Sequence, residues 1–160
     1  KKVDFLSDAR EENANYLSNQ LDQLPGIRPP AVGPGIRHGF YGYPVRFDEA
    51  QAGLPRDRFV AALRAEGIPT GEGYVEPIYL EPIYQQRIGY GSRGCPFTCS
   101  HNLESDVSYE HGICPVAERM YEVELVNHGL VYHGVSRSDL DDVVRAYEKL
   151  LEGAGQLIAE

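Results

Sequence analysis

Apolar residues recur at helical spacing in three parts of the chain, and these predict the main helices. The first part, residues 4–24, has a weak apolar face that includes Phe5 and Leu6 and is interrupted by polar residues at 10–15. A helix this polar in its first half is typical of one that packs against a partner. We expect it to end at Pro25-Gly26, because proline and glycine together mark a turn.

The other two helical patterns are clearer. Residues 55–66 carry the apolar stripe Phe59, Val60 and Leu63 and are followed by Gly67, the residue type that most often caps a helix end. The last pattern starts at Ser138, with Asp141 at capping-box spacing. Its apolar stripe consists of Leu140, Val143, Val144, Tyr147, Leu150 and Leu151.

Alternation of apolar and polar residues predicts three strands. Residues 38–47 alternate around Tyr43, although Pro44 disfavours a central, fully paired position. A short strand follows at Ile68. Residues 121–126 alternate apolar with acidic side chains, which is typical of an exposed edge strand.

The remaining segments show neither period. Residues 48–54 are predicted to be a loop, 153–160 a tail, and a short helix begins at Pro115. Residues 75–113 form the longest aperiodic stretch, and a loop of that length in a compact domain usually has a function or packs on a partner. The order of elements predicts an α+β fold in which helices cover one face of a small, mostly antiparallel sheet.

Composition excludes several classes of protein. The chain has 160 residues, the size of one domain, and a net charge of −9 from 24 acidic and 15 basic residues. Without a basic cluster it lacks the footprint of a nucleic-acid-binding protein. Its apolar runs are far shorter than the ~20 residues that span a bilayer, and its first residues lack the apolar core of a secretory signal. Three cysteines without such a signal indicate reduced thiols and a cytoplasmic location.

Six segments, taken in order, resemble one enzyme family over about residues 9–149. They are Asn13-Ala14-Asn15-Tyr16-Leu17, Tyr41-Gly42-Tyr43-Pro44-Val45-Arg46, Arg58-Phe59-Val60-Ala61-Ala62-Leu63, Gly71-Glu72-Gly73-Tyr74-Val75-Glu76-Pro77-Ile78-Tyr79, Cys114-Pro115-Val116-Ala117-Glu118-Arg119 and Asp139-Leu140-Asp141-Asp142-Val143. Together they resemble the C-terminal part of the DegT/StrS sugar aminotransferases, which use pyridoxal phosphate (PLP).

The resemblance implies that residues 1–160 are the C-terminal small domain of an enzyme built like aspartate aminotransferase, with 1–24 as its leading helix and 75–113 as its long loop. In that family a separate large domain holds PLP, and the enzymes are homodimers. The full enzyme would move an amino group from glutamine or glutamate to a keto-sugar or keto-cyclitol. The chain's lysines are Lys1, Lys2 and Lys149, and none lies in a motif that matches the family's Schiff-base lysine. We therefore expect no catalytic residue here and no transamination by this segment alone.

The resemblance leaves substrate contact as the role of this segment. Gly71 and Gly73 allow the substrate to approach the backbone closely. Tyr74 can stack on a sugar ring, and Glu72 can accept a hydrogen bond from a sugar hydroxyl. Arg46 and Arg137 could each bind a carboxylate in bidentate fashion. For each candidate a purely structural role stays open. The candidates are Gly71, Glu72, Gly73, Tyr74, His38, Tyr41, Arg46 and Arg137.

Two other functions stay open. One is a non-catalytic binding module derived from the same family, and the other is a small zinc-stabilised domain. Potential zinc ligands gather at Cys95, Cys99, His101, His111 and Cys114, but their spacing is unlike that of a zinc ribbon. For a segment of a larger enzyme we expect an exposed apolar patch that includes Phe5, Leu6 and the 75–113 loop, and self-association of the isolated chain.

Overall fold

The structure, a computed structural model, describes residues 1–97 and 106–159. The chain forms two compact units. The first consists of residues 1–74 and 123–160, and the second of residues 75–122. No helix among the described residues is long and apolar enough to cross a membrane.

A four-stranded sheet organises the first unit. Its order is β1-β2-β4-β3 and every pairing is antiparallel. The strands are β1 (Ile27–Arg28), β2 (Tyr43–Phe47), β3 (Thr70–Glu72) and β4 (Leu125–His128). The fold is therefore α+β with a small antiparallel sheet, as the sequence predicts.

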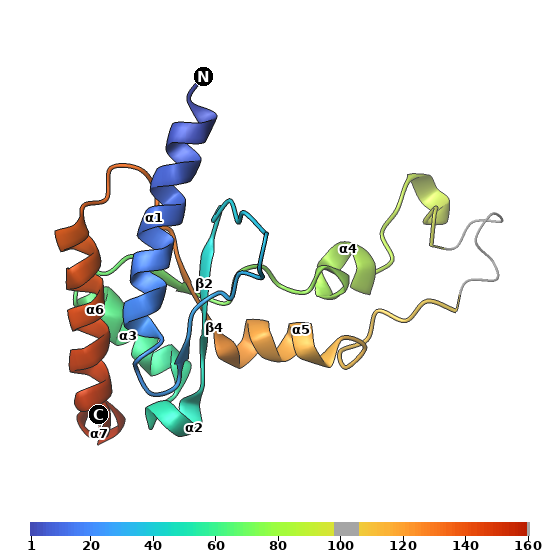
Figure 1. Ribbon diagram of the computed structural model, residues 1–160. Helices are drawn as coiled ribbons and strands as arrows, with labels where there is room; N and C mark the ends of the chain where they lie inside the picture. Colours follow the sequence, from blue (N-terminus) through green and yellow to red (C-terminus); the bar gives the residue numbers. More distant parts are fainter. Residues whose placement is uncertain (98–105, 160) are drawn as a thin grey trace. The chain divides into compact units, whose positions relative to one another are not determined.

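Helices cover one face of this sheet. Figure 1 shows α1 (Val3–Leu21), α3 (Arg56–Ala65) and α6 (Arg137–Glu152) on the same side of β2 and β4. On that side Tyr43, Val45 and Phe47 are buried, whereas Arg46 of the same strand is exposed. This alternation follows from the two-residue period of a strand. We call the uncovered side the open face.

The core lies between the sheet and the helices. The ring of Phe59 in α3 stacks on Phe47 of β2 at 4.8 Å and meets Tyr147 of α6 edge-on at 5.0 Å. Leu17 and Leu21 of α1 complete it without any exposed surface. Aromatic pairs at these distances stabilise a core beyond the area that they bury.

The three predicted helices are present, and their caps are local. After α3, Gly67 takes φ 87° and donates its N–H to the Arg64 carbonyl, while Ile68 donates to Leu63. The prediction for the last helix was wrong in one respect. The capping box is formed by Ser136 and Asp139, two residues earlier than the predicted pair, because Ser136 has extended backbone (φ −84°, ψ 164°) and α6 begins at Arg137.

Four other predictions need correction. The predicted loop 48–54 contains the one-turn helix α2 (Glu49–Ala52), in which Asp48 accepts the backbone N–H groups of Ala50 and Gln51. The predicted tail contains α7 (Ala154–Ala159). The predicted edge strand 121–126 is instead the π-helix η3 (Met120–Glu124) followed by β4, an inner strand. The predicted strand 38–47 begins at Tyr43.

Pro44 lies in an inner strand, which the sequence disfavoured. Its neighbour on one side is Asn127 of β4. On the other side, β1 pairs only with Arg46 and Phe47. Pro44 is thus edge-like towards β1, and this relieves the conflict between a missing N–H and a two-sided ladder.

The second unit consists of short turns. They are η1 (Ile78–Leu80), α4 (Pro82–Gln85), η2 (Gly91–Arg93) and α5 (Pro115–Arg119), the last being the helix predicted at Pro115. Its aromatic centre is formed by Tyr84, Phe97 and Tyr109, whose ring centroids lie 5.3–6.1 Å apart. Several apolar side chains remain exposed, including Val75, Ile78 and Ile88.

Candidate substrate-contact face

The glycine–tyrosine segment, Gly71 to Tyr74, leaves the sheet where the edge strand β3 ends. Gly71 and Glu72 pair with Asn127 and Val126 of β4. Gly73 then takes φ 61° and donates its N–H to the Leu125 carbonyl at 2.8 Å. Glycine suits this position because L-residues, which carry a Cβ, rarely adopt positive φ.

Tyr74 follows that turn and is 53% exposed. Its Cε2 atom lies 4.0 Å from the point that a Cβ on Gly42 would occupy. Gly42 directly precedes β2, so the turn at Gly73 brings the tyrosine ring beside a strand on the far side of β4. A half-exposed aromatic ring held over glycine backbone is suited to stacking against a sugar ring.

The open face beneath this ring contains a polar residue that sequence reasoning missed. Asn127 of β4 stands in one cross-strand row between Pro44 of β2 and Gly71 of β3. Its Oδ1 atom is buried, and no donor among the described residues hydrogen-bonds it. The only sequence signal was a polar residue between Val126 and His128, and strand alternation alone gave it no neighbours.

Of the other predicted residues, Tyr41 is next to Gly42 and 84% exposed. His38 is engaged locally: its Nδ1 accepts the Phe40 N–H at 3.0 Å and its ring lies 4.4 Å from the Phe40 ring. Phe40 is buried with φ 41°, a strained conformation that this bond helps to hold.

The charged candidates are paired within the first unit. Glu72 accepts from Arg64 of α3 at 3.2 Å, and Arg46 pairs with Glu124 at 3.1 Å. Arg137 lies 3.8 Å above the Tyr16 ring and donates to Glu12, which joins the start of α6 to α1. The structure therefore places Gly71 and Gly73 beside β4 and the Tyr74 ring beside Gly42. It engages Glu72, Arg46 and Arg137 in ion pairs.

Titratable groups cluster in the second unit around Glu118. This carboxylate is almost fully buried and accepts hydrogen bonds from the Tyr79 hydroxyl and from the Gly112 N–H, the latter at 2.7 Å. The bond from Tyr79 is the main cause that lowers the pKa of Glu118. Burial, followed by the Glu118 contact, raises the pKa of Tyr79 to about 12. Tyr79 is thus kept protonated as a hydrogen-bond donor.

His111 lies at the rim of the same cluster. Its Nε2 is 2.8 Å from Glu122, and its Nδ1 is 3.7 Å from Glu118. The hydrogen bond to Glu122 and the charge of Glu118 raise the pKa of His111. The hydrogen bond between Tyr79 and Glu118 ties η1 to α5 and so holds the Pro77-Ile78-Tyr79 segment in place.

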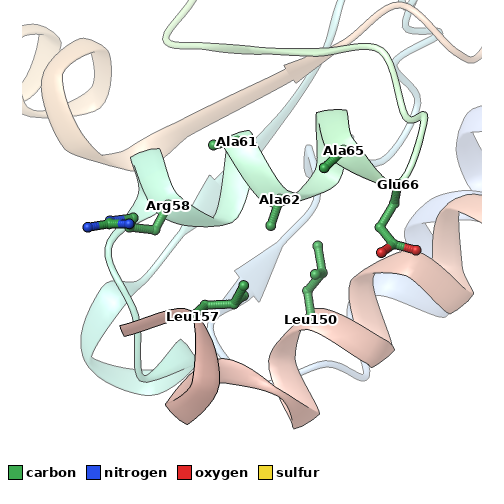
Figure 2. A pocket seen from close by; sticks show the side chains of 7 residues that line it. All are labelled: Arg58, Ala61, Ala62, Ala65, Glu66, Leu150 and Leu157. Atoms are coloured by element: carbon green, nitrogen blue, oxygen red, sulfur yellow. The ribbon is translucent and has the colours of Figure 1, made fainter. Parts of the chain in front are cut away.

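A separate pocket of ≈ 300 Å³ lies on the helical side of the first unit. Figure 2 shows Ala62, Leu150 and Leu157 around a space between α3 and the C-terminal helices, with Arg58 and Glu66 near its ends. The pocket is open and lined largely by small apolar groups. It contains none of the predicted substrate-contact residues.

The three lysines lie on or next to helices of the first unit. Lys149 places its Nζ 2.7 and 2.8 Å from the two carboxylate oxygens of Glu66, and Lys1 and Lys2 precede α1. No three His, Cys, Asp or Glu side chains among residues 1–97 and 106–159 are grouped to hold a metal. Cys99 and His101, two of the predicted zinc ligands, lie outside the described residues.

The comparisons with known proteins agree on one family. The model of the DegT/DnrJ/EryC1/StrS aminotransferase family matches residues 1–105. The chain is 27% identical over 155 residues to the spore coat polysaccharide biosynthesis protein SpsC of Bacillus subtilis (strain 168). The matched region covers 96% of this chain and 34% of that protein. It is 28% identical over 169 residues to a Micromonospora echinospora protein provisionally named an L-glutamine:3-amino-2,3-dideoxy-scyllo-inosose aminotransferase, covering 98% and 37%.

Solved structures show the same fold. DesV of S. venezuelae, determined with a ketimine intermediate, superposes with a TM-score of 0.70 at 21% identity, covering 94% of this chain and 33% of that one. DesI, determined with its TDP-sugar product, gives a TM-score of 0.68 at 21% identity, covering 99% and 34%. The chain thus spans about a third of the length of the relatives that it matches. With its sheet, helices and matched residues, this chain belongs to the DegT/DnrJ/EryC1/StrS aminotransferase family.

Proposed function

We propose that this chain is the C-terminal small domain of a PLP-dependent sugar aminotransferase and that it contributes contacts to the substrate. The observation that carries the proposal is the half-exposed Tyr74 ring, which the Gly73 turn holds beside Gly42 on the open face. Membership of the family supports amino transfer by the full enzyme. The names of the relatives, which mention L-glutamine, a scyllo-inosose and a TDP-sugar product, support glutamine as donor and a keto-cyclitol or keto-sugar as acceptor; we keep glutamate as the alternative donor.

In such an enzyme the chemistry of amino-group transfer would be supplied by bound PLP. The lysines of this chain do not fit the role of its Schiff-base anchor, because Lys149 is held by Glu66 on the helical side. We therefore place the anchor in a large domain of the same enzyme, which would be a cytoplasmic homodimer. The task of the chain's own residues is then to bind and orient the acceptor, and Tyr74 would stack on its ring.

An exposed apolar surface supports a packing role against that large domain. In α1, Val3 is 72% exposed, Phe5 58% and Leu6 40%. Together with Tyr132 and His133, Val3 and Leu6 line an open pocket of ≈ 330 Å³. Exposed apolar side chains grouped in this way mark an interaction surface.

The intact mass of the protein in its source cell is the first test. We expect a mass well above the 17.8 kDa of this chain. A mass equal to it, with no amino transfer from glutamine to any keto-sugar or keto-cyclitol, would favour the non-catalytic binding module instead.

Tyr74 is then tested in the intact protein. Tyr74→Ala should lower kcat/KM for the acceptor by about ten-fold, which corresponds to the ~1.4 kcal/mol expected from one ring contact. Tyr74→Phe retains the stacking face and should keep most of the activity. If Tyr74→Ala behaves like the wild type, Tyr74 does not contact the acceptor.

A further inference from the structure

The open face holds an amide oxygen in a position where the protein itself cannot satisfy it. The cross-strand neighbours of Asn127 are Pro44 and Gly71, and neither has a side-chain donor. The Oδ1 atom is buried, and no described residue hydrogen-bonds it. Native proteins rarely leave such an atom unpaired, because burial removes its water without replacing it.

Two glycines leave the backbone without side chains near this oxygen. A Cβ on Gly42 would lie 3.6 Å from Asn127 Oδ1 and 4.0 Å from Tyr74 Cε2, and a Cβ on Gly71 would meet no atom within 4 Å. Neither glycine has the positive φ that demands this residue type, unlike Gly73. The backbone therefore does not account for them. What they share is a missing side chain, at the residue before β2 and within β3, on the two sides of Asn127.

We propose that Asn127 Oδ1 accepts a hydrogen bond from a ring hydroxyl of a polyol, which enters above Gly42 and Gly71 and stacks on Tyr74. The inference rests on the proposed function, since it assigns the acceptor's hydroxyl to a particular residue of the same face. Cyclitols and pyranosides share this chemistry: a ring with an apolar face and hydroxyl donors at its edge. Because Oδ1 is closed to solvent, the ligand reaches it only when a side chain beside it moves, whereas the Tyr74 ring is already half exposed.

The 160-residue chain allows a direct test by NMR, with the side-chain amide of Asn127 as reporter. The probes are myo-inositol and methyl β-D-glucopyranoside, titrated separately into the ¹⁵N-labelled chain. We expect a saturable shift of the Asn127 and Tyr74 signals with a Kd in the millimolar range, as befits one hydrogen bond and one stacked ring. The probe that binds more tightly identifies the acceptor as a cyclitol or a pyranoside.

Two variants and one control isolate the contact. Gly42→Ala places a methyl group at ordinary van der Waals distance from both Oδ1 and Tyr74, so it should fill the space without unfolding the chain and weaken binding at least about ten-fold. Asn127→Leu keeps the side-chain volume, removes the acceptor and should weaken binding similarly. Gly39→Ala has open space around the added methyl and should bind as the wild type does.

Equal affinities of wild type, Gly42→Ala and Asn127→Leu, or no saturable shift with either probe, would overturn the inference. These results are separable from the proposed function. If the intact protein transfers amino groups but neither polyol shifts the Asn127 signal, the proposed contact is refuted and the proposed function stands. A shift that Gly42→Ala abolishes, in a protein without amino transfer, would leave a polyol site on a non-catalytic module.

Discussion

The core of the first unit predicts a pH dependence of stability that one residue should dominate near pH 5. His128 of β4 is 1% exposed, and its Nε2 lies 2.5 Å from the Tyr147 hydroxyl. Burial lowers the pKa of His128 to about 4 from the ordinary 6.5. The unfolded chain therefore binds a proton below about pH 6.5, whereas the folded chain resists it until about pH 4.

The direction and the size of the pH effect on stability follow from the difference between the His128 pKa values of the folded and unfolded chain. Since the unfolded state binds more protons between the two pKa values, the free energy of unfolding falls as pH falls. Between about pH 7.5 and pH 5 the loss from His128 is about 2 kcal/mol, out of a typical total of ~5–15 kcal/mol. The lowered pKa values of Glu118 and Asp139 act at lower pH, and the raised pKa of His111 acts in the opposite direction.

Urea denaturation of wild type and His128→Gln, followed by circular dichroism at about pH 7.5 and 5, measures the effect. Glutamine can still hydrogen-bond Tyr147 but does not titrate, so contributions from the other groups cancel in the difference between the two proteins. With a slope near ~2 kcal/mol/M, the wild-type midpoint should fall by about 1 M more than that of the variant. The exposed His133 supplies the control, because His133→Gln should retain the wild-type pH dependence. Parallel midpoints for wild type and His128→Gln would refute the linkage.

Three further predictions concern other parts of the chain. Ser136→Ala removes the N-cap of α6, whose Oγ accepts the Asp139 N–H, and should reduce the free energy of unfolding by about 1 kcal/mol; an unchanged melting temperature would contradict the capping role. Tyr79→Phe deletes the hydroxyl that donates to Glu118, so the Glu118 pKa measured by NMR should rise; a constant value would mean that Gly112 and His111 suffice. Phe5→Ser should reduce self-association of the 160-residue chain in sedimentation experiments, and a wild type that is strictly monomeric would count against an interaction surface on α1.

Local pattern was sufficient for the three long helices. The stripe from Leu140 to Leu150 predicts α6 because a 3.6-residue period depends only on neighbours along the chain. Gly67 and Gly73 were likewise recognisable as a cap and a loop glycine. The resemblance that named the family rests on such local segments, and it also singled out Tyr74.

Strand partners were decided by tertiary structure. The alternation at 121–126 predicts an exposed edge, yet β4 lies between β2 and β3 and begins only at Leu125. Strands of two to five residues carry too little pattern to show their position in a sheet. Which strand is inner depends on segments that are distant in sequence.

For the candidate site too, local features were predictable from the sequence, whereas neighbours across the sheet were not. By itself the sequence determined an α+β domain of this family with a glycine–tyrosine loop, because those signals are local. It did not reveal that Asn127 stands between Pro44 and Gly71, or that Gly42 lies beside Tyr74. Those neighbours come from the register of three strands, and register is set when the buried faces of Tyr43, Val45 and Val126 meet the helices. Only the packed core could place an unsatisfied amide oxygen beside Gly42.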